Sequence, residues 1–406
     1  MRLLKFRLTE SRFMRLSWIL LILMTLLSGQ FIYHQFFDSS ATDARPGRDF
    51  LTFYAAGWMA LKGQAVSSYN FASLHAIEQQ FVPGASAFAW YYPPTALLFN
   101  APLTWLNHTA AYLAFMTASL GIYGLGCWRN WPDKRTLFAV FGFTGVTVNI
   151  VFGQNGLLTA GLFLLAWADL PQRPVRAGIW LALLALKPHL FCLWLPLLVL
   201  TKQWRTLVSF TLFSGYFLML SLWAFGLEAW LAWWHTIAQA QTNLALGKLP
   251  WDKMISIYAH WRLLGLSTTW GYVGQALIAL SALLLCIDIW RHTQQRALQG
   301  SAVALTTLCI SPYLYDYELA WLSITLLLLC QRGLTMGFYC GEKLLYFTLW
   351  LYPVIDMLVL DSIKPSLSPV IIVSLLLWVR YLAHQADTIS YYSVTRCGYS
   401  LGSRKS

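Results

Sequence analysis

Hydrophobic residues occur along this chain in long runs that are separated by short polar segments. A helix that crosses a bilayer needs about 20 apolar residues, because lipid offers no hydrogen-bond partner to a free backbone N–H or C=O. The pattern predicts about twelve crossings, several of them short or broken, within an all-α polytopic membrane helix bundle that forms a single domain over residues 1–406. The predicted crossings are 16–33, 108–128, 136–151, 155–169, 177–187, 188–200, 206–226, 272–290, 299–312, 318–331, 344–361 and 368–385.

The composition excludes the usual classes of soluble protein. Only 11% of the residues are charged, whereas a soluble protein carries about 25%. The seven cysteines are scattered through apolar segments without metal-ligand spacing, which excludes a zinc framework and a disulfide scaffold. The sequence also lacks a Walker A loop, a dinucleotide fingerprint and a nucleophile elbow, so we expect no cofactor and no metal.

Two long polar regions, 34–94 and 227–271, interrupt the predicted crossings. Most of the 28 Lys and Arg residues lie in the other connecting segments, and cytoplasmic loops are enriched in these residues. We therefore expect a multi-pass protein of the inner (plasma) membrane with both termini in the cytoplasm, including a cytoplasmic tail over 386–406. The net charge of +12 then reflects orientation rather than nucleic-acid binding.

Both polar regions would then face outward. They are rich in Trp and Tyr, which favour the headgroup level of a membrane, so we expect short amphipathic helices on the outer membrane surface. An aromatic belt with no further role would also explain most of these residues.

Asp49 follows soon after the first predicted crossing and stands between basic and aromatic neighbours. Arg45 and Arg48 precede it, and Phe50 and Phe53 begin a helical pattern. A helix N-cap or an ion pair with Arg48 would explain the carboxylate. A functional alternative is a general base, which needs a carboxylate within hydrogen-bond reach of a hydroxyl group.

Three further segments contain polar residues in apolar surroundings. The segment 311–318 places Asp316 and Glu318 among tyrosines after a proline, which suggests a polar pocket or ordinary helix capping. Lys187, followed by His189, would hold a lipid phosphate or extend to the interface, since a charge within the membrane is costly. Gln154 and Asn155, between two glycines, would present amides to a sugar or form a hairpin tip.

Taken in order, these landmarks resemble glycosyltransferase family 87, a group of polytopic enzymes in the C superfamily of integral-membrane glycosyltransferases. The resemblance spans about residues 45–320. It rests on Asp49-Phe50, Phe53-Tyr54-Ala55-Ala56, Gly63, Tyr69, Tyr92-Pro93-Pro94, Ala101-Pro102, Gly153-Gln154-Asn155, Lys187-Pro188 and Ser311-Pro312.

The resemblance implies an inverting enzyme that needs no metal. Such an enzyme would move a sugar, mannose or another hexose, from a polyprenyl-phosphate-linked donor to an extracytoplasmic hydroxyl on a lipid or glycan. Asp49 matches the acid of the first outer loop and would act as base, while Lys187, Arg48 or Arg262 would stabilise the departing phosphate. The substrate-binding residues implied are Arg48, Tyr54, Tyr92, Gln154, Asn155, Lys187, His189, Tyr315, Asp316 and Tyr317.

One segment departs from the family pattern, which has a histidine where this chain reads Tyr315-Asp316-Tyr317. Either Asp316 or a tyrosine takes that role, or the donor differs. Other functions also fit the pattern of crossings. A transporter or flippase for polyprenyl-linked glycans would share the broken helices and buried charges, although the two halves show no convincing duplication. A non-catalytic envelope assembly protein and an oligosaccharide ligase or polymerase are further alternatives.

Overall fold

The computed structural model describes residues 47–86, 88–133, 136, 140–358 and 365–385, together with a few positions between 15 and 26. Most of the predicted crossing 16–33 and all of the tail 386–406 lie outside the described residues. The described chain is helical and contains no strand, which confirms the all-α prediction. Its first half contains α2 (Phe50–Leu61), η1 (Val66–Tyr69), α3 (Phe71–Phe81), α4 (Pro94–Asn100), η2 (Ala101–Trp105), α5 (His108–Asn130), α7 (Thr144–Phe152), α8 (Gly156–Asp169), α9 (Pro174–Leu184), α10 (Pro188–Phe191) and α11 (Trp194–Leu200), where η marks a 3-10 helix.

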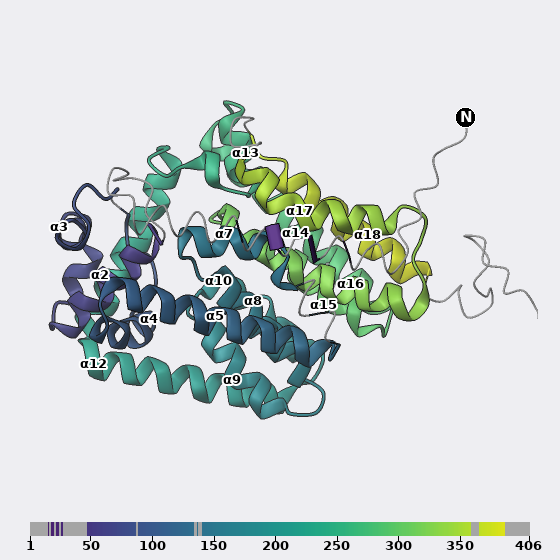
Figure 1. Ribbon diagram of the computed structural model, residues 1–406, viewed down its shortest axis with the longest axis horizontal. Coiled ribbons are helices and arrows are strands. Elements are labelled where there is room, and N and C mark those ends of the chain that lie inside the picture. Colours follow the sequence, from purple (N-terminus) through teal and green to yellow (C-terminus); the bar gives the residue numbers. More distant parts are fainter. Residues whose placement is uncertain are drawn as a thin grey trace, which may run out of the picture.

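The second half begins with the longest helix of the described chain, α12, which has 42 residues. Its elements are α12 (Trp204–Ala245), η3 (Trp251–Lys253), α13 (Ile257–Leu263), α14 (Thr268–His292), α15 (Arg296–Ile310), η4 (Asp316–Trp321), α16 (Leu322–Met336), α17 (Glu342–Leu358) and α18 (Ser368–Gln385). Figure 1 shows α2, α3 and α4 together at one end of the molecule, which we call the outer end, with the later helices α14 to α18 extending away from it.

Among the described residues, five segments are long and apolar enough to cross a membrane: α5, α12, α14, the continuous segment from η4 through α16, and α18. The chain is therefore a membrane protein, but the expected number of about twelve crossings is not confirmed. Several predicted crossings are short helices packed inside the protein. In α8, for example, 14 residues rise only about 21 Å and all but two of them are buried. Continuous apolar sequence here reflects burial among other helices, which the pattern alone does not distinguish from contact with lipid.

Two hydrophobic cores organise the described chain. The larger contains residues from α5 through α18 and includes Trp167 and Trp321. The smaller, which we call the outer-end core, surrounds α2 and contains Phe50, Trp90 and Tyr112. Ten of the 12 residues of α2 are buried, so this helix differs from the amphipathic surface helix expected for the first polar region. By contrast, α3 buries only Leu74 and Glu78 and leaves its other face open.

Helix α12 joins the two ends of the molecule. Gly226 has non-helical angles (φ 78°, ψ 166°) inside it, a conformation that glycine adopts at little cost. Beyond this break, the indole N–H of Trp233 donates to Tyr91 O (3.1 Å) and the hydroxyl of Thr236 donates to Tyr69 O (3.4 Å). The sequence predicted a crossing that ends at residue 226 and short amphipathic surface helices beyond it, whereas the chain continues past Gly226 as one helix that packs on the outer-end core.

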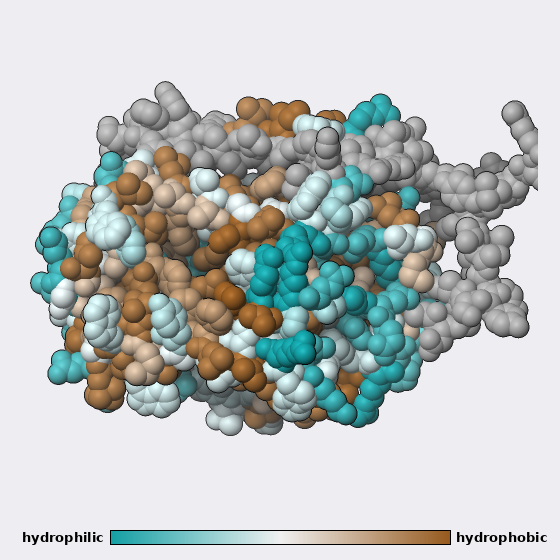
Figure 2. All heavy atoms as spheres, turned by 90° about the horizontal axis from the view of Figure 1, so that it is seen from below, coloured by the Kyte–Doolittle hydropathy of each residue, from teal (hydrophilic) through white to brown (hydrophobic). Residues whose placement is uncertain are grey.

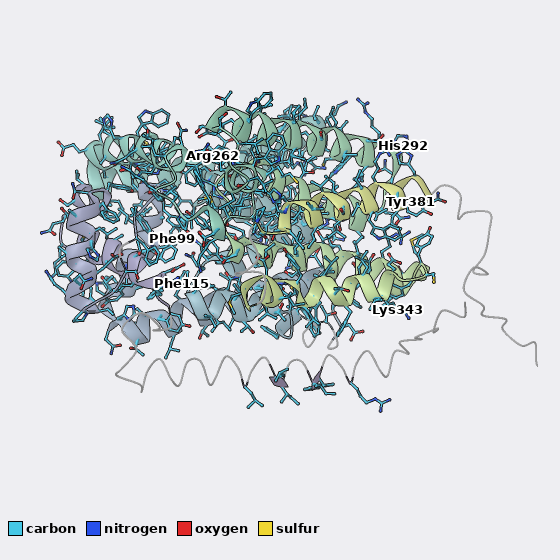
Figure 3. The ribbon with its side chains drawn as sticks, turned by 90° about the horizontal axis from the view of Figure 1, so that it is seen from above. Phe99, Phe115, Arg262, His292, Lys343 and Tyr381 are labelled. Carbon is cyan, nitrogen blue, oxygen red and sulfur yellow. The ribbon has the colours of Figure 1, made fainter. Side chains whose placement is uncertain are left out.

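The basic connecting segments that the sequence placed in the cytoplasm gather at the opposite end. Arg129 and Arg176 pair with the buried Asp169, and Arg332 donates to Gln295. In Figure 3, His292, Lys343 and Tyr381 lie far from Phe99 and Phe115, which belong to the outer end. Seen from below, apolar residues cover much of the left and middle of the surface, whereas hydrophilic residues gather toward the right (Figure 2). This separation of charge and apolar surface is what a helix bundle embedded in lipid requires.

Candidate functional site

Asp49 lies in a turn that is bonded to the end of a helix from a distant part of the chain. The amides of Gly47 and Asp49 donate to the carbonyl oxygens of Val151 and Phe152, both at 3.1 Å. The last turn of a helix leaves carbonyl groups without partners inside the helix, and these two amides satisfy two of them. The turn that contains Asp49 is thereby fixed to α7.

Glycine at position 153 permits this close approach. Gly153 ends α7 in the left-handed conformation (φ 72°), and a Cβ atom there would lie 2.6 Å from Gly47 Cα and 2.7 Å from Phe50 Cβ. Backbone atoms cannot move aside as a flexible side chain can. The glycine before Gln154 therefore sets the distance between α7 and the Asp49 turn.

The Asp49 carboxylate does not cap its helix, although Asp49 is the residue that precedes α2. One oxygen, Oδ2, accepts a hydrogen bond of 2.8 Å from the Gln154 side-chain amide. The other, Oδ1, is buried, lies 3.6 Å from Arg48 Nε, and has no hydrogen-bond partner among the described residues. Asp49 therefore does not act as the N-cap of α2. Its Oδ1 atom forms an ion pair with Arg48 but accepts no hydrogen bond, so it can still accept one from a ligand.

The surroundings of Asp49 alter its acidity. Burial raises the pKa of the Asp49 carboxyl above its ordinary value, while the Gln154 hydrogen bond and the positive charges of Arg48 and Lys253 act in the opposite direction. A carboxylate with a raised pKa is a stronger base, and it loses its charge as the pH falls through that pKa.

A second group of contacts connects the predicted residues Tyr92, Asn155 and Lys187. The Asn155 amide donates to the Tyr92 hydroxyl (3.0 Å). Lys187 is only 4% exposed, and its Nζ donates to Glu318 Oε1 at 2.6 Å. The ammonium also lies 5.6 Å from the centre of the Tyr92 ring and 4.9 Å from that of Tyr317. Lys187 therefore does not extend to the interface, and its charge is already balanced.

Glu318 is the partner that the sequence-based set of site residues omitted. It was noted only as one of two acids in a polar pocket, because nothing in the local sequence connects it with Lys187, 131 positions earlier. One signal was available in the sequence. A charged residue within an apolar segment, such as Lys187 or Glu318, is stable there only when it pairs with an opposite charge.

The segment that contains Asp316 is fixed by backbone contacts. The Asn149 amide donates to Tyr317 O (3.0 Å), and Glu318 Oε2 accepts from the Tyr315 N–H (2.7 Å). Asp316 Oδ1 accepts from the Tyr317 N–H at 2.8 Å. Asp49 and Asp316 interact electrostatically with each other and with Lys253, so the two carboxylates share one polar region.

Two of the predicted site residues have other surroundings. Tyr54 belongs to the outer-end core, where its hydroxyl donates to Leu106 O (2.9 Å) rather than to Asp49. His189 is half-buried in α10 close to Lys187, and its buried Nε2 has no hydrogen-bond partner among the described residues. The structure therefore associates His189 with the Lys187 region and separates the Tyr54 hydroxyl from the carboxylate.

Several buried polar atoms around Asp49 share the same lack of partners. Within the described part of the chain, Asp49 Oδ1, Arg48 Nε, Gln154 Oε1 and Asn155 Oδ1 are buried without a hydrogen bond. Buried polar atoms are nearly always paired, so such a concentration points to a ligand or ordered water. The mixture of acceptors and donors suits the hydroxyl groups of a sugar.

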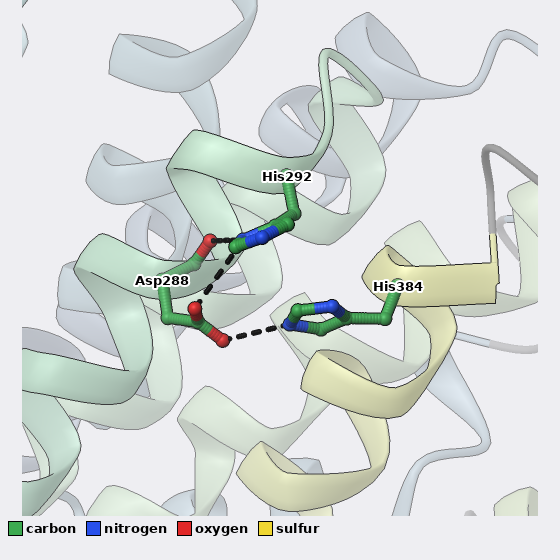
Figure 4. Close-up of side chains that lie close together, drawn as sticks. All are labelled: Asp288, His292 and His384. Carbon is green, nitrogen blue, oxygen red and sulfur yellow. Dashed lines mark hydrogen bonds and ion pairs between the residues drawn. The ribbon is translucent and has the colours of Figure 1, made fainter.

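A separate group of ionisable side chains, Asp288, His292 and His384, lies at the opposite end (Figure 4). Their possible metal-ligating atoms all lie within 4.8 Å of one another, a grouping that sequence analysis missed although the i, i+4 spacing of Asp288 and His292 is visible. The Asp288 carboxylate already accepts from Arg380 Nε (2.6 Å) and His384 Nε2 (2.9 Å). As it stands, the group is an ion-pair cluster that ties α14 to α18.

Long apolar helices and a half-buried carboxylate at one end define a polytopic membrane protein with an enzyme-like site. Comparison with known families matches residues 90–312 to glycosyltransferase family 87. Because this range is more than half of the chain, the protein belongs to that family and is a glycosyltransferase. The resemblance seen in the sequence is thereby confirmed. No match was found among curated proteins or among solved structures.

The matched range includes part of the candidate site. Tyr92, Gln154, Asn155 and Lys187 lie within it, whereas Asp49 precedes its first residue. The hydrogen bond from Gln154 therefore connects the carboxylate to the matched part of the chain.

Proposed function

We propose that this glycosyltransferase moves a hexose, such as mannose, from a polyprenyl-phosphate-linked donor to a hydroxyl group of a lipid or glycan on the outer side of the membrane. The observation that carries the proposal is the Asp49 carboxylate. The side chain is half-buried, Gln154 holds one oxygen, and the other oxygen accepts no hydrogen bond from the described residues, although Arg48 Nε lies 3.6 Å away. This arrangement leaves one oxygen free to accept a proton.

The reaction needs one base and a means of stabilising a leaving phosphate. The acceptor oxygen attacks the anomeric carbon, Asp49 takes the hydroxyl proton, and the phosphate departs with the electron pair of the broken bond. Attack from the face opposite the phosphate inverts the anomeric centre. A phosphate leaves readily without protonation, so a single carboxylate suffices. The amides of Gln154 and Asn155 would hold sugar hydroxyls, and the nearby tyrosines would support the ring.

The test is a transfer assay with the purified protein in lipid nanodiscs, using a panel of polyprenyl-phosphate hexoses and a membrane extract as acceptor. We expect Asp49→Asn to reduce transfer at least about a hundredfold, since a missing general base typically costs this much. Glu228→Gln, at an exposed position of α12, is the matched control and should keep normal activity. Full activity in Asp49→Asn with unchanged thermal stability would exclude the base assignment.

The proposed topology places the outer end on the extracytoplasmic side of the inner membrane and both termini in the cytoplasm. The outer end contains the site and the aromatic side chains, while the paired arginines lie at the other end. A reporter fused after Gly84 should be read outside, and one fused after Lys134 inside. The opposite result for either fusion would reject this orientation.

A further inference from the structure

The cations near Asp49 differ in how far their charges are already engaged. Lys187 is paired with Glu318 at 2.6 Å, in a contact that buries both side chains. The Arg262 guanidinium donates to two backbone carbonyl oxygens and lies 4.5 Å from the centre of the Trp251 ring. Lys187 is therefore not free to neutralise an additional negative charge. Arg262 keeps its charge, because carbonyl groups and an indole ring do not neutralise a guanidinium, but these contacts hold it beside Trp251.

Two other cations are Arg48, which forms an ion pair with Asp49 (3.6 Å), and Lys253, which has no such partner among the described residues. They lie against the same aromatic ring: the Arg48 guanidinium carbon is 5.7 Å and Lys253 Nζ is 5.6 Å from the centre of Phe152. Lys253 forms neither a hydrogen bond nor an ion pair through its side chain within the described ranges. Both charges act on the Asp49 carboxylate.

The backbone around Lys253 is fixed, so its position beside the site does not depend on a loose loop. The Ile255 amide donates to Leu314 O (2.9 Å), and Met254 forms a bridge with Tyr315. These contacts join η3 to the segment that contains Asp316. Lys253, in the second polar region of the sequence, thus adds a cation to the site. The first polar region and the end of α7 form the rest of that site around Asp49.

We propose that Lys253, with Arg48 beside it, binds the phosphate group of the donor and stabilises the charge that develops there during transfer. This inference rests on the proposed function. As the bond between the anomeric carbon and the phosphate oxygen breaks, that oxygen keeps the electron pair and its negative charge grows. An ammonium group beside it lowers the energy of this state. The proton of the acceptor hydroxyl goes to Asp49, and the products are the glycoside and a polyprenyl phosphate.

Binding of two probes separates this inference from the proposed function. The probes are a polyprenyl phosphate and the polyprenol of the same length, measured by native mass spectrometry with the full-length protein in nanodiscs. We expect the wild-type protein to prefer the phosphate. Lys253→Gln should weaken binding of the phosphate at least about tenfold and leave binding of the polyprenol unchanged. Lys253→Arg should retain most of the preference.

Lys248→Gln is the matched control, because Lys248 is an exposed lysine close by in the same polar region. It should bind both probes as the wild type does. If the wild type prefers the phosphate and Lys253→Gln keeps that preference, the role of Lys253 is refuted while the proposed donor class stands. If the wild type itself does not distinguish the two probes, the polyprenyl-phosphate donor is rejected and the inference with it.

Discussion

The buried pair of Lys187 and Glu318 makes a sharp prediction about stability. Each side chain is almost completely enclosed, with exposures of 5% and 1%, and Nζ lies 2.6 Å from Oε1. Removing one partner of such a pair leaves the other charge buried and unbalanced, which costs about 3–5 kcal/mol. Removing both charges leaves no unbalanced group, so the loss should be much smaller than the sum of the two single losses.

Suitable substitutions are Lys187→Met, which keeps the length of the side chain, and Glu318→Gln, which keeps an oxygen for the Tyr315 N–H. We expect the double variant to unfold at a higher detergent concentration than either single variant, which requires a coupling free energy larger than one single loss of about 3–5 kcal/mol. The measurement is unfolding by SDS in mixed micelles, followed by circular dichroism and by tryptophan fluorescence.

A control pair combines Lys187→Met with Asp288→Asn. Asp288 belongs to the ion-pair cluster at the other end of the molecule, so the two losses should add. Additive losses for Lys187→Met with Glu318→Gln would refute the reasoning, because they would mean that the two charges do not depend on each other.

Two more substitutions test the Asp49 region. Gln154→Met removes the donor to Asp49 Oδ2 and should further raise the pKa of the Asp49 carboxyl, so the acid limb of the kcat/KM profile should move to higher pH by about one to two pH units. An unmoved limb in an active variant would contradict the assigned hydrogen bond. The control is Gln172→Met, at an exposed position. Gly153→Ala places a Cβ atom 2.6 Å from Gly47 Cα in a left-handed residue, so it should destabilise the protein by about 2–5 kcal/mol and reduce transfer. The control is Gly215→Ala, where a Cβ meets nothing within 4 Å and transfer should be unchanged. If Gly153→Ala unfolds at the same SDS concentration as the wild type, the close approach is not required.

Much of the fold could be predicted because apolar runs in this chain are helices. The predicted crossing 272–290 corresponds to α14 (Thr268–His292), and 368–385 has the same bounds as α18. The number of crossings could not be predicted, since burial within protein and exposure to lipid select the same residues. The short amphipathic helices expected beyond Gly226 did not indicate one helix continuous with the preceding crossing, because its contacts with Tyr69 and Tyr91 depend on how distant segments pack.

The candidate site was predictable as a set of segments but not as a set of contacts. Asp49, Gln154 and Asn155 stood out because they are polar residues at breaks in apolar sequence. Lys253 did not, since a lysine in a polar region is ordinary and only its proximity to Phe152 gives it meaning. Contacts between residues more than 100 positions apart depend on how the helices pack, which local patterns do not encode.

The turn that holds Asp49 also has a consequence for biosynthesis. Its backbone bonds to Val151 and Phe152, and its carboxylate bonds to Gln154, so none of these contacts exists while only the first outer segment has been translated. Roughly 270 further residues separate Asp49 from Tyr317, and a ribosome needs on the order of tens of seconds to add them. A nascent chain that ends before Tyr317 therefore lacks the complete candidate site, because the contact between Asn149 and Tyr317 cannot yet form.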